Sequence, residues 1–290
     1  MCEATELIAQ SLDTGARSIG NRIDGLAGTL RTAVNSARNV DADGAEVINR
    51  GRYSFDVSDS QGALLHVSDI RVNPLVDHEG NIFGISFPTA REGDPGVSFP
   101  DEEAYSAWSR QPNRLGDTEF YPEQRVTPVD GGEPYWAEAG PGQPAPWADD
   151  AQDGMLYVQA HADSRGFRID ANLGTDDNPD WQNMILSGNA FGKLVAANKD
   201  FQAASRAGAG KPLLMLACRA GDPVYAHAEQ AAGVIHRAGM NHDVYATVGV
   251  NVARWSETRG TAEVGVEVPN GTTPSDVIVV IRAPNSPTGP

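Results

Sequence analysis

Two short, predominantly apolar blocks constrain the fold of this 290-residue chain more than any other feature of its sequence. The first is MLYVQA at 155–160, and the second is PLLMLA at 212–217. Unbroken apolar runs of this length are typical of strands that are covered on both faces, as in a parallel sheet. The segment SGNAFGKLVAANKDF at 187–201 lies between them and has helical spacing, with Ser187 as its expected N-cap. Strand, helix and strand in this order predict a parallel β-sheet.

The same alternation continues towards the C-terminus. Residues 223–238 predict a second helix, which Asp222 would cap with Pro223 at its first position and which Gly239 would end. Strands are expected at 243–252, 261–268 and 276–283. The second of these strands would pair with the later part of the first across the turn SETRG. We therefore predict an α/β fold with a mostly parallel sheet flanked by helices and a C-terminal β-hairpin.

The N-terminal half gives a weaker signal. Apolar residues in steps of three and four over 4–38 predict a helix, and the period shifts towards two from residue 51 onward, which predicts two to four strands. Pro, Gly and acidic residues dominate 88–150, where DEEAYSAWSR predicts one short helix within a long irregular connection. We expect three parts: a helical segment at 1–50, strands with the irregular connection at 51–150, and the main α/β domain at 151–290.

The composition limits the partners. A net charge of −17 argues against nucleic acid and against an anionic membrane surface, because both bind basic proteins. It also disfavours a highly phosphorylated ligand. No signal peptide and no apolar run of roughly 20 residues is present, so we expect a cytoplasmic location or delivery as part of a larger protein. Cys2 and Cys218 do not form a disulfide framework.

Two chemically active side chains follow the apolar blocks. His161 comes directly after the first block and Cys218 directly after the second. The carboxyl ends of parallel strands meet at the edge of the sheet where α/β proteins place their active sites, so the two side chains should lie close together. A histidine beside a thiol raises its thiolate fraction or acts as general base, and can then protonate a leaving amine.

Backbone and nearby side chains would complete such a site. The N–H groups of Cys218 and Ala162 could hold a developing oxyanion, and the start of the 223–238 helix would favour a thiolate. Three further polar residues could form a substrate pocket: Asp163, Arg219 and Asp222. Acidic side chains there would favour a basic substrate residue. A buried, purely structural Cys218 remains the alternative.

Other motifs point elsewhere. Asp77-His78-Glu79 could be offered as metal ligands, but it precedes Gly80-Asn81 between two apolar runs and predicts a hairpin turn. His66 falls within a strand, His227 and His236 on the second helix, and His242 in a turn, and we predict no metal site. No phosphate loop, dinucleotide fingerprint or G-x-S-x-G motif is present, so no cofactor is expected.

The blocks LYVQAH and LLMLAC resemble those of the caspase-like (clan CD) cysteine peptidase superfamily, in which one apolar block ends in His and another in Ala-Cys. FGKLVAAN and GKPLLMLACRAG look most like the autoprocessing toxin-type and "lonely Cys" domains of very large actinobacterial proteins. The resemblance covers roughly residues 150–285. It implies Cys218 as nucleophile, His161 as base or acid, and a flap-like hairpin around 244–268. The family usually has glycine after the histidine, where this chain has Ala162.

Our leading hypothesis is therefore a cysteine endopeptidase that hydrolyses peptide bonds, within its own parent chain or elsewhere, with 125–150 as a candidate processing loop. An inositol phosphate activator, known in toxin-type relatives, is not expected for so acidic a chain. The alternative is a catalytically inactive caspase-like scaffold or interaction module. A third hypothesis is a bacterial toxin effector with a substrate in another cell.

Overall fold

The structure is a computed structural model. The residues it describes are 55–56, 64–65, 67–89, 100–111, 119–132, 134–175, 178–256, 261–269 and 272–284. The helix predicted at 4–38 and His66 lie outside the described residues. Among those described, no helix has both the length and the apolar character needed to cross a membrane.

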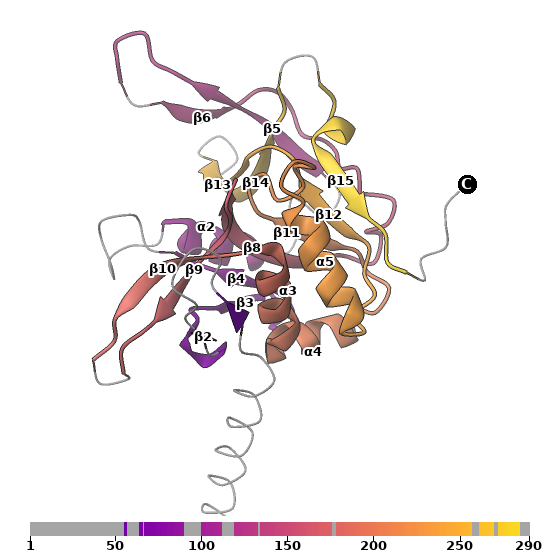
Figure 1. Cartoon of the computed structure of the whole chain (residues 1–290). Helices are drawn as coiled ribbons and strands as arrows, with labels where there is room; N and C mark the ends of the chain where they lie inside the picture. Colours follow the sequence, from indigo (N-terminus) through magenta and orange to yellow (C-terminus); the bar gives the residue numbers. More distant parts are fainter. Residues whose placement is uncertain are drawn as a thin grey trace, which may run out of the picture. The chain divides into compact units, whose positions relative to one another are not determined.

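A mixed, largely parallel sheet of six strands forms the centre of the described part (Figure 1). Its four inner strands are parallel, and the strand at each end runs antiparallel to its neighbour. The predicted α/β class is therefore confirmed. The strands in spatial order are β3 (Asn73–Val76), β4 (Ile82–Phe87), β8 (Leu156–Asp163), β11 (Leu213–Leu216), β12 (Val244–Thr247) and β15 (Ile278–Ile281).

The two apolar blocks form β8 and β11, as predicted. The strand β8 is longer than expected, because His161 to Asp163 continue it and pair with β9 (Gly166–Asn172). The antiparallel strand β10 (Trp181–Leu186) follows β9 and forms a hairpin with it. His161 is thus inside a strand rather than just beyond its end.

Helices α3 (Gly188–Ala197), α4 (Lys199–Ala207) and α5 (His227–Arg237) cover one face of the sheet (Figure 1). The single helix predicted at 187–201 is wrong, because Asn198 ends α3 and its side chain caps α4 by accepting from the Phe201 N–H at 2.9 Å. Ser187 caps α3 as predicted, accepting from Ala190 at 3.3 Å.

The predicted start of the second helix is also wrong, since α5 begins at His227 rather than at residue 223. The Asp222 carbonyl accepts from the N–H groups of Tyr225 and Ala226, which closes a separate turn. Ala226 then has φ 53°, a left-handed conformation that interrupts helical hydrogen bonding. The positive end of the α5 dipole is consequently farther along the chain from Cys218 than expected.

A second sheet covers the other face of the central sheet. Its strands in spatial order are β13 (Asn251–Ser256), β14 (Thr261–Glu267), β5 (Glu119–Val126) and β6 (Tyr135–Glu138), with β7 (Gln143–Pro144) beside β5. The predicted pairing across SETRG is confirmed. Two predictions are wrong: 243–252 divides into β12 and β13, and the connection predicted as irregular contains β5 and β6.

Two apolar cores lie on the opposite faces of the central sheet. Leu156, Val158 and Ala160 face the helices, whereas Tyr157 faces the second sheet, as strand alternation requires. The short helix α2 (Pro100–Ser109), predicted from DEEAYSAWSR, adds buried aromatic side chains to this second core.

The remaining elements are short. The turn predicted between two strands at Asp77–Gly80 is confirmed: it joins β3 to β4, and the Asp77 carboxylate accepts the Asn81 N–H at 2.8 Å. The remaining short elements are β1 (Phe55–Asp56), β2 (Leu64–Leu65) and the 3₁₀ turns at Val67–Asp69 and Pro274–Asp276.

Candidate active site

Cys218 lies in the turn that follows β11. Leu216 ends the strand, Ala217 is buried, and Cys218 is half-buried. Its thiol donates to the backbone carbonyl oxygen of Asn251 at 3.7 Å. The sulfur is therefore at the surface of the core, beside the start of β13, rather than enclosed within the core.

The turn after Cys218 is held by the connection between β12 and β13. The Arg219 N–H donates to the Gly249 carbonyl at 2.7 Å, and the Gly221 N–H donates to the Thr247 carbonyl at 2.8 Å. The Ala220 N–H donates back to Ala217 at 3.2 Å. These three N–H groups are already donated within the protein, so they do not serve as oxyanion donors in this arrangement.

Arg219, the residue after Cys218, has a left-handed backbone with φ 57°. A residue with a Cβ atom in this region costs about 1–2 kcal/mol relative to the right-handed form. The hydrogen bonds on both sides of Arg219 maintain this conformation. Strained backbone of this kind is common at functional sites.

His161 is half-buried in β8, opposite Arg168 of β9. Strand alternation places its side chain on the same face as Tyr157 and Gln159, the face that the second sheet covers. Cys218 lies on that face too, because its sulfur partner Asn251 lines a cavity there with Leu216.

The register of β8 and β11 relates the two candidates. Leu216 is the partner of Gln159, and the two chains run parallel. His161 is two residues beyond Gln159, and Cys218 is two residues beyond Leu216. Beyond this pair β8 continues as a strand through His161, whereas the chain turns after Leu216, where the Ala217 N–H donates to the Met215 carbonyl at 3.0 Å. Cys218 therefore lies in a turn at the same carboxyl edge of the sheet as His161.

The acidic residues near the rim already have partners. The Asp163 carboxylate is paired with Arg165 at 3.0 Å and with Arg168 at 2.8 Å. Burial alone would raise the pKa of Asp163, but the hydrogen bonds from Arg165 and Arg168 outweigh it and hold that pKa well below its usual value. Asp222 accepts the N–H of Val224 at 2.9 Å.

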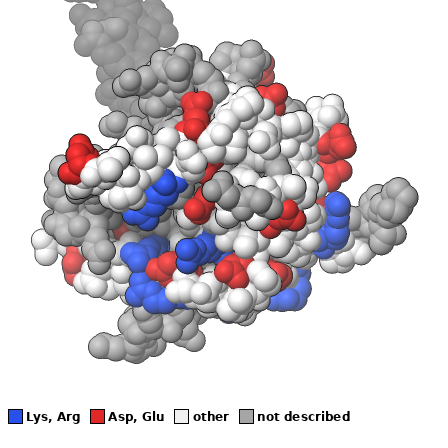
Figure 2. Space-filling view, turned by 90° about the horizontal axis from the view of Figure 1, so that it is seen from above, with Lys and Arg blue, Asp and Glu red and all other residues white. Residues whose placement is uncertain are grey.

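Ala162 is in the paired part of β8, opposite Phe167. Arg219, the residue after Cys218, has an exposed side chain. On the face drawn in Figure 2, Asp and Glu side chains are spread widely and Lys and Arg gather in small groups between them. That face shows no continuous basic surface among the described residues.

The sequence did not identify two polar contacts at this edge. Ser86 of β4 donates to the Gln159 side-chain oxygen at 2.5 Å, and both residues are buried. Thr247, also buried, donates to the Ala217 carbonyl at 3.0 Å and accepts from the Asn251 amide at 2.8 Å. These residues come from different strands, so no local sequence motif links them to Cys218.

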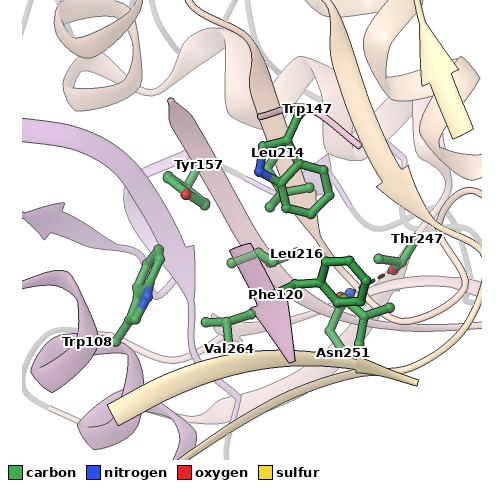
Figure 3. A pocket seen from close by; sticks show the side chains of 10 residues that line it. Trp108, Phe120, Trp147, Tyr157, Leu214, Leu216, Thr247, Asn251 and Val264 are labelled. Carbon is green, nitrogen blue, oxygen red and sulfur yellow. Dashed lines mark hydrogen bonds between the residues drawn. The ribbon is translucent and has the colours of Figure 1, made fainter. Parts of the chain in front are cut away.

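A small cavity of about 10 Å³ lies behind the cysteine turn, between the two sheets (Figure 3). Its walls are mostly aromatic and aliphatic, and Thr247 and Asn251 form its polar end (Figure 3). The side-chain oxygen of Asn251 is buried and has no hydrogen-bond partner among the described residues. The surface that the cavity itself exposes is apolar, so a void of this size is expected to be dry.

His227 and His242 are both buried. His227 is the first residue of α5, as its place on the second predicted helix implies, and its ring lies 3.3 Å from the Ser164 carbonyl. His242 lies in the segment between α5 and β12, outside any helix or strand, as predicted. Sequence pattern alone did not indicate that other segments pack over these two residues.

A scan of protein-family models found no match to this chain, and searches of the curated proteins and of the solved structures found none either. No group of three or more potential metal ligands occurs among the described residues. The arrangement of Cys218 and His161 therefore carries the functional argument.

Proposed function

We propose that this chain is a cysteine endopeptidase domain in which Cys218 is the nucleophile and His161 the general base. One observation carries the proposal: the parallel pairing of Gln159 with Leu216, from which both side chains follow after two residues. The left-handed Arg219 beside the sulfur supports it. We also propose that the fold is caspase-like, with β13 and β14 as the flap-like hairpin.

The chemistry would proceed through an acyl-enzyme. His161 takes the thiol proton, and the Cys218 sulfur attacks the peptide carbonyl to form a tetrahedral intermediate. The protonated imidazole then gives its proton to the leaving amine, and water hydrolyses the thioester by the reverse transfers. The backbone N–H groups of Cys218 and Ala162 are the proposed oxyanion donors. The thiol must leave the Asn251 carbonyl before it reacts.

The two ends of the candidate processing loop differ in how exposed they are to cleavage. Within 125–150, Trp147 is only 1% exposed, and Asp150 accepts a hydrogen bond from Tyr245 of β12. That end of the segment would have to unfold locally to be cleaved. The tip between β5 and β6 is different, since Val129 is fully exposed there. We propose this tip, 127–132, as the self-cleavage site.

The test is cleavage in the purified chain and in a longer parent polypeptide, with new N-termini identified by mass spectrometry. The variants C218A and H161A should both abolish cleavage, and a thiol-directed inhibitor should modify Cys218 in the unaltered protein only. Ser275→Ala, at an exposed site, is the control and should cleave normally. Undiminished cleavage in C218A would overturn the proposal.

Hydrogen-bond donors at Cys218 that already have partners favour a second candidate function, that of an inactive scaffold. The thiol donates to Asn251, and the three N–H groups after it are taken. The alkylation rate of Cys218 against pH separates the two functions. A thiol pKa near the ordinary value of about 8.5 supports the scaffold, whereas a strongly lowered value supports the peptidase. A toxin effector would add expression toxicity that C218A removes.

A further inference from the structure

A second pocket lies at the amino ends of the parallel strands, opposite the edge that carries Cys218. It is formed where α4 and α5 end, just before β11 and β12 begin. The pocket is open and has a volume of about 700 Å³, within the range of small-molecule sites. Its polar lining includes Gln202, Ser205, Arg206, Asn241 and His242.

Ser205 and His242 form a short hydrogen bond in this pocket. The Ser205 hydroxyl oxygen is 2.6 Å from Nε2 of His242, and Nδ1 of His242 is 2.8 Å from the Lys211 carbonyl oxygen. A carbonyl oxygen only accepts, so the Nδ1 atom must carry the proton. In the neutral ring Nε2 then has the lone pair, and the Ser205 O–H donates to it.

The surroundings keep His242 neutral. Burial lowers the pKa of His242, and the nearby His236 lowers it further, although the hydrogen bond to the Lys211 carbonyl acts in the opposite direction. His236 itself is held 2.8 Å from the His242 carbonyl. Ser205 is 6% exposed and His242 3% exposed, yet both line the pocket. The imidazole is thus available as a base.

This is the hydrogen-bond order of an activated serine: a hydroxyl, an imidazole base, and an acceptor that fixes the ring's tautomer. We propose that Ser205 is the nucleophile of a second, serine-type acyl-transfer site, with His242 as its base and the Lys211 carbonyl as the orienting acceptor. The substrate class is a small carboxylic ester. Arg206 favours a substrate with an anionic substituent, and with Asn241 it offers N–H donors to the oxyanion.

The proposed step is balanced within the site. The Ser205 oxygen bonds to the ester carbonyl carbon as its proton moves to Nε2 of His242. The tetrahedral intermediate collapses, the carbon–oxygen bond to the alcohol breaks, and the alcohol leaves with the proton from Nε2. Water then attacks the acyl-serine, again giving its proton to Nε2, and the carboxylic acid and the free hydroxyl result.

A structural role would use the same bonds, since they tie α4 to the segments before β11 and β12. Chemical labelling distinguishes the two roles, because a serine held only for packing does not react with a fluorophosphonate. The experiment uses the full chain carrying C218A, which removes the proposed peptidase nucleophile. A fluorophosphonate probe is added, the modified residue is mapped by mass spectrometry, and p-nitrophenyl acetate hydrolysis is followed.

We expect the probe on Ser205 and hydrolysis that S205A abolishes and that H242N lowers by about 100-fold or more. Ser205→Cys keeps a nucleophile beside the imidazole and should be alkylated by iodoacetamide faster than S205C combined with H242N. This comparison holds even if S205A fails to fold. Absence of the probe from Ser205 in folded protein, or equal alkylation of the two cysteine variants, would overturn the proposal. Because C218A lacks the proposed peptidase nucleophile, ester hydrolysis by this variant tests the Ser205 proposal independently of the peptidase proposal.

Discussion

Gln159 of β8 and Leu216 of β11 lie opposite each other in parallel register. Gln159 also pairs with Ser86 of β4, so residues of three neighbouring strands are in register at this level. From this row β8 continues as a strand through His161, whereas β11 stops and turns at Cys218. The imidazole is therefore on a strand, and the thiol is on a turn that contains a strained residue, Arg219. This arrangement suits a base in a fixed position and a nucleophile that moves with its turn.

The Thr247 hydroxyl holds this turn. Thr247→Val leaves the buried Ala217 carbonyl and the Asn251 amide without their partner, so we expect a loss of about 1–3 kcal/mol in the free energy of unfolding. The turn should also loosen, and Cys218 should be alkylated faster. Urea denaturation and iodoacetamide kinetics measure the two effects. Thr247→Ser keeps the hydroxyl, so Cys218 in this variant should be alkylated at the rate of the unaltered protein. If Cys218 is alkylated at that same rate in T247V, the anchoring role of Thr247 is contradicted.

The left-handed residues Arg219 and Ala226 offer a paired test of strain. Glycine adopts positive φ without a Cβ penalty, so R219G and A226G should each raise the free energy of unfolding by up to about 1 kcal/mol. Arg219 has an exposed side chain, and its removal should cost little. If the strain serves the candidate site, R219G should also change the alkylation rate of Cys218, while A226G should leave it unchanged. Destabilisation by both variants would show that neither backbone is strained.

Glycines set the contact between α3 and α5. A Cβ atom on Gly192 would lie 2.6 Å from the Ala231 carbonyl oxygen, a backbone atom that cannot move aside cheaply. Gly192→Ala should therefore destabilise the protein by about 1–3 kcal/mol through overpacking. On α5, a Cβ on Gly233 would approach only the flexible end of Arg237 at 3.4 Å, so G233A should be neutral or gain up to about 1 kcal/mol from helix propensity. Thermal unfolding of both variants tests this contrast, which equal melting temperatures would refute.

The sequence predicted the inner strands β8 and β11 of the central sheet well, because strands buried on both faces are largely apolar and, apart from Gln159, both blocks are. It did not predict the end of β8, since His161 to Asp163 are polar and pair with a hairpin formed later in the chain. Asp222-Pro223 is a common helix start. The helix start predicted there is wrong because the Asp222 carbonyl closes a local turn instead.

The sequence did not predict the strands β5 and β6 of the second sheet, for two physical reasons. Its strand β5 contains Pro122 and the fully buried Glu123, residue types that are depleted in strands. Its pairing of β5 with β14 also joins segments far apart in the chain. For the same reason the contacts of Cys218 with Asn251, and of Ser205 with His242, have no sequence signal, because tertiary packing alone brings them together.

The paired carboxylate of Asp163 gives a pH-dependent prediction. Its folded-state pKa is below the ordinary value of about 3.8, so the pair stabilises the protein above that pH, and the contribution is lost as the pH falls towards the folded-state value. Asp163 is partly exposed, and the effect should stay within about 1 kcal/mol. The difference in melting temperature between the unaltered protein and D163N should therefore be positive at pH 7 and shrink below pH 4. Arg168→Met, which removes one partner, should reduce that difference at pH 7. A difference that is the same at both pH values would mean that the carboxylate contributes nothing through its charge.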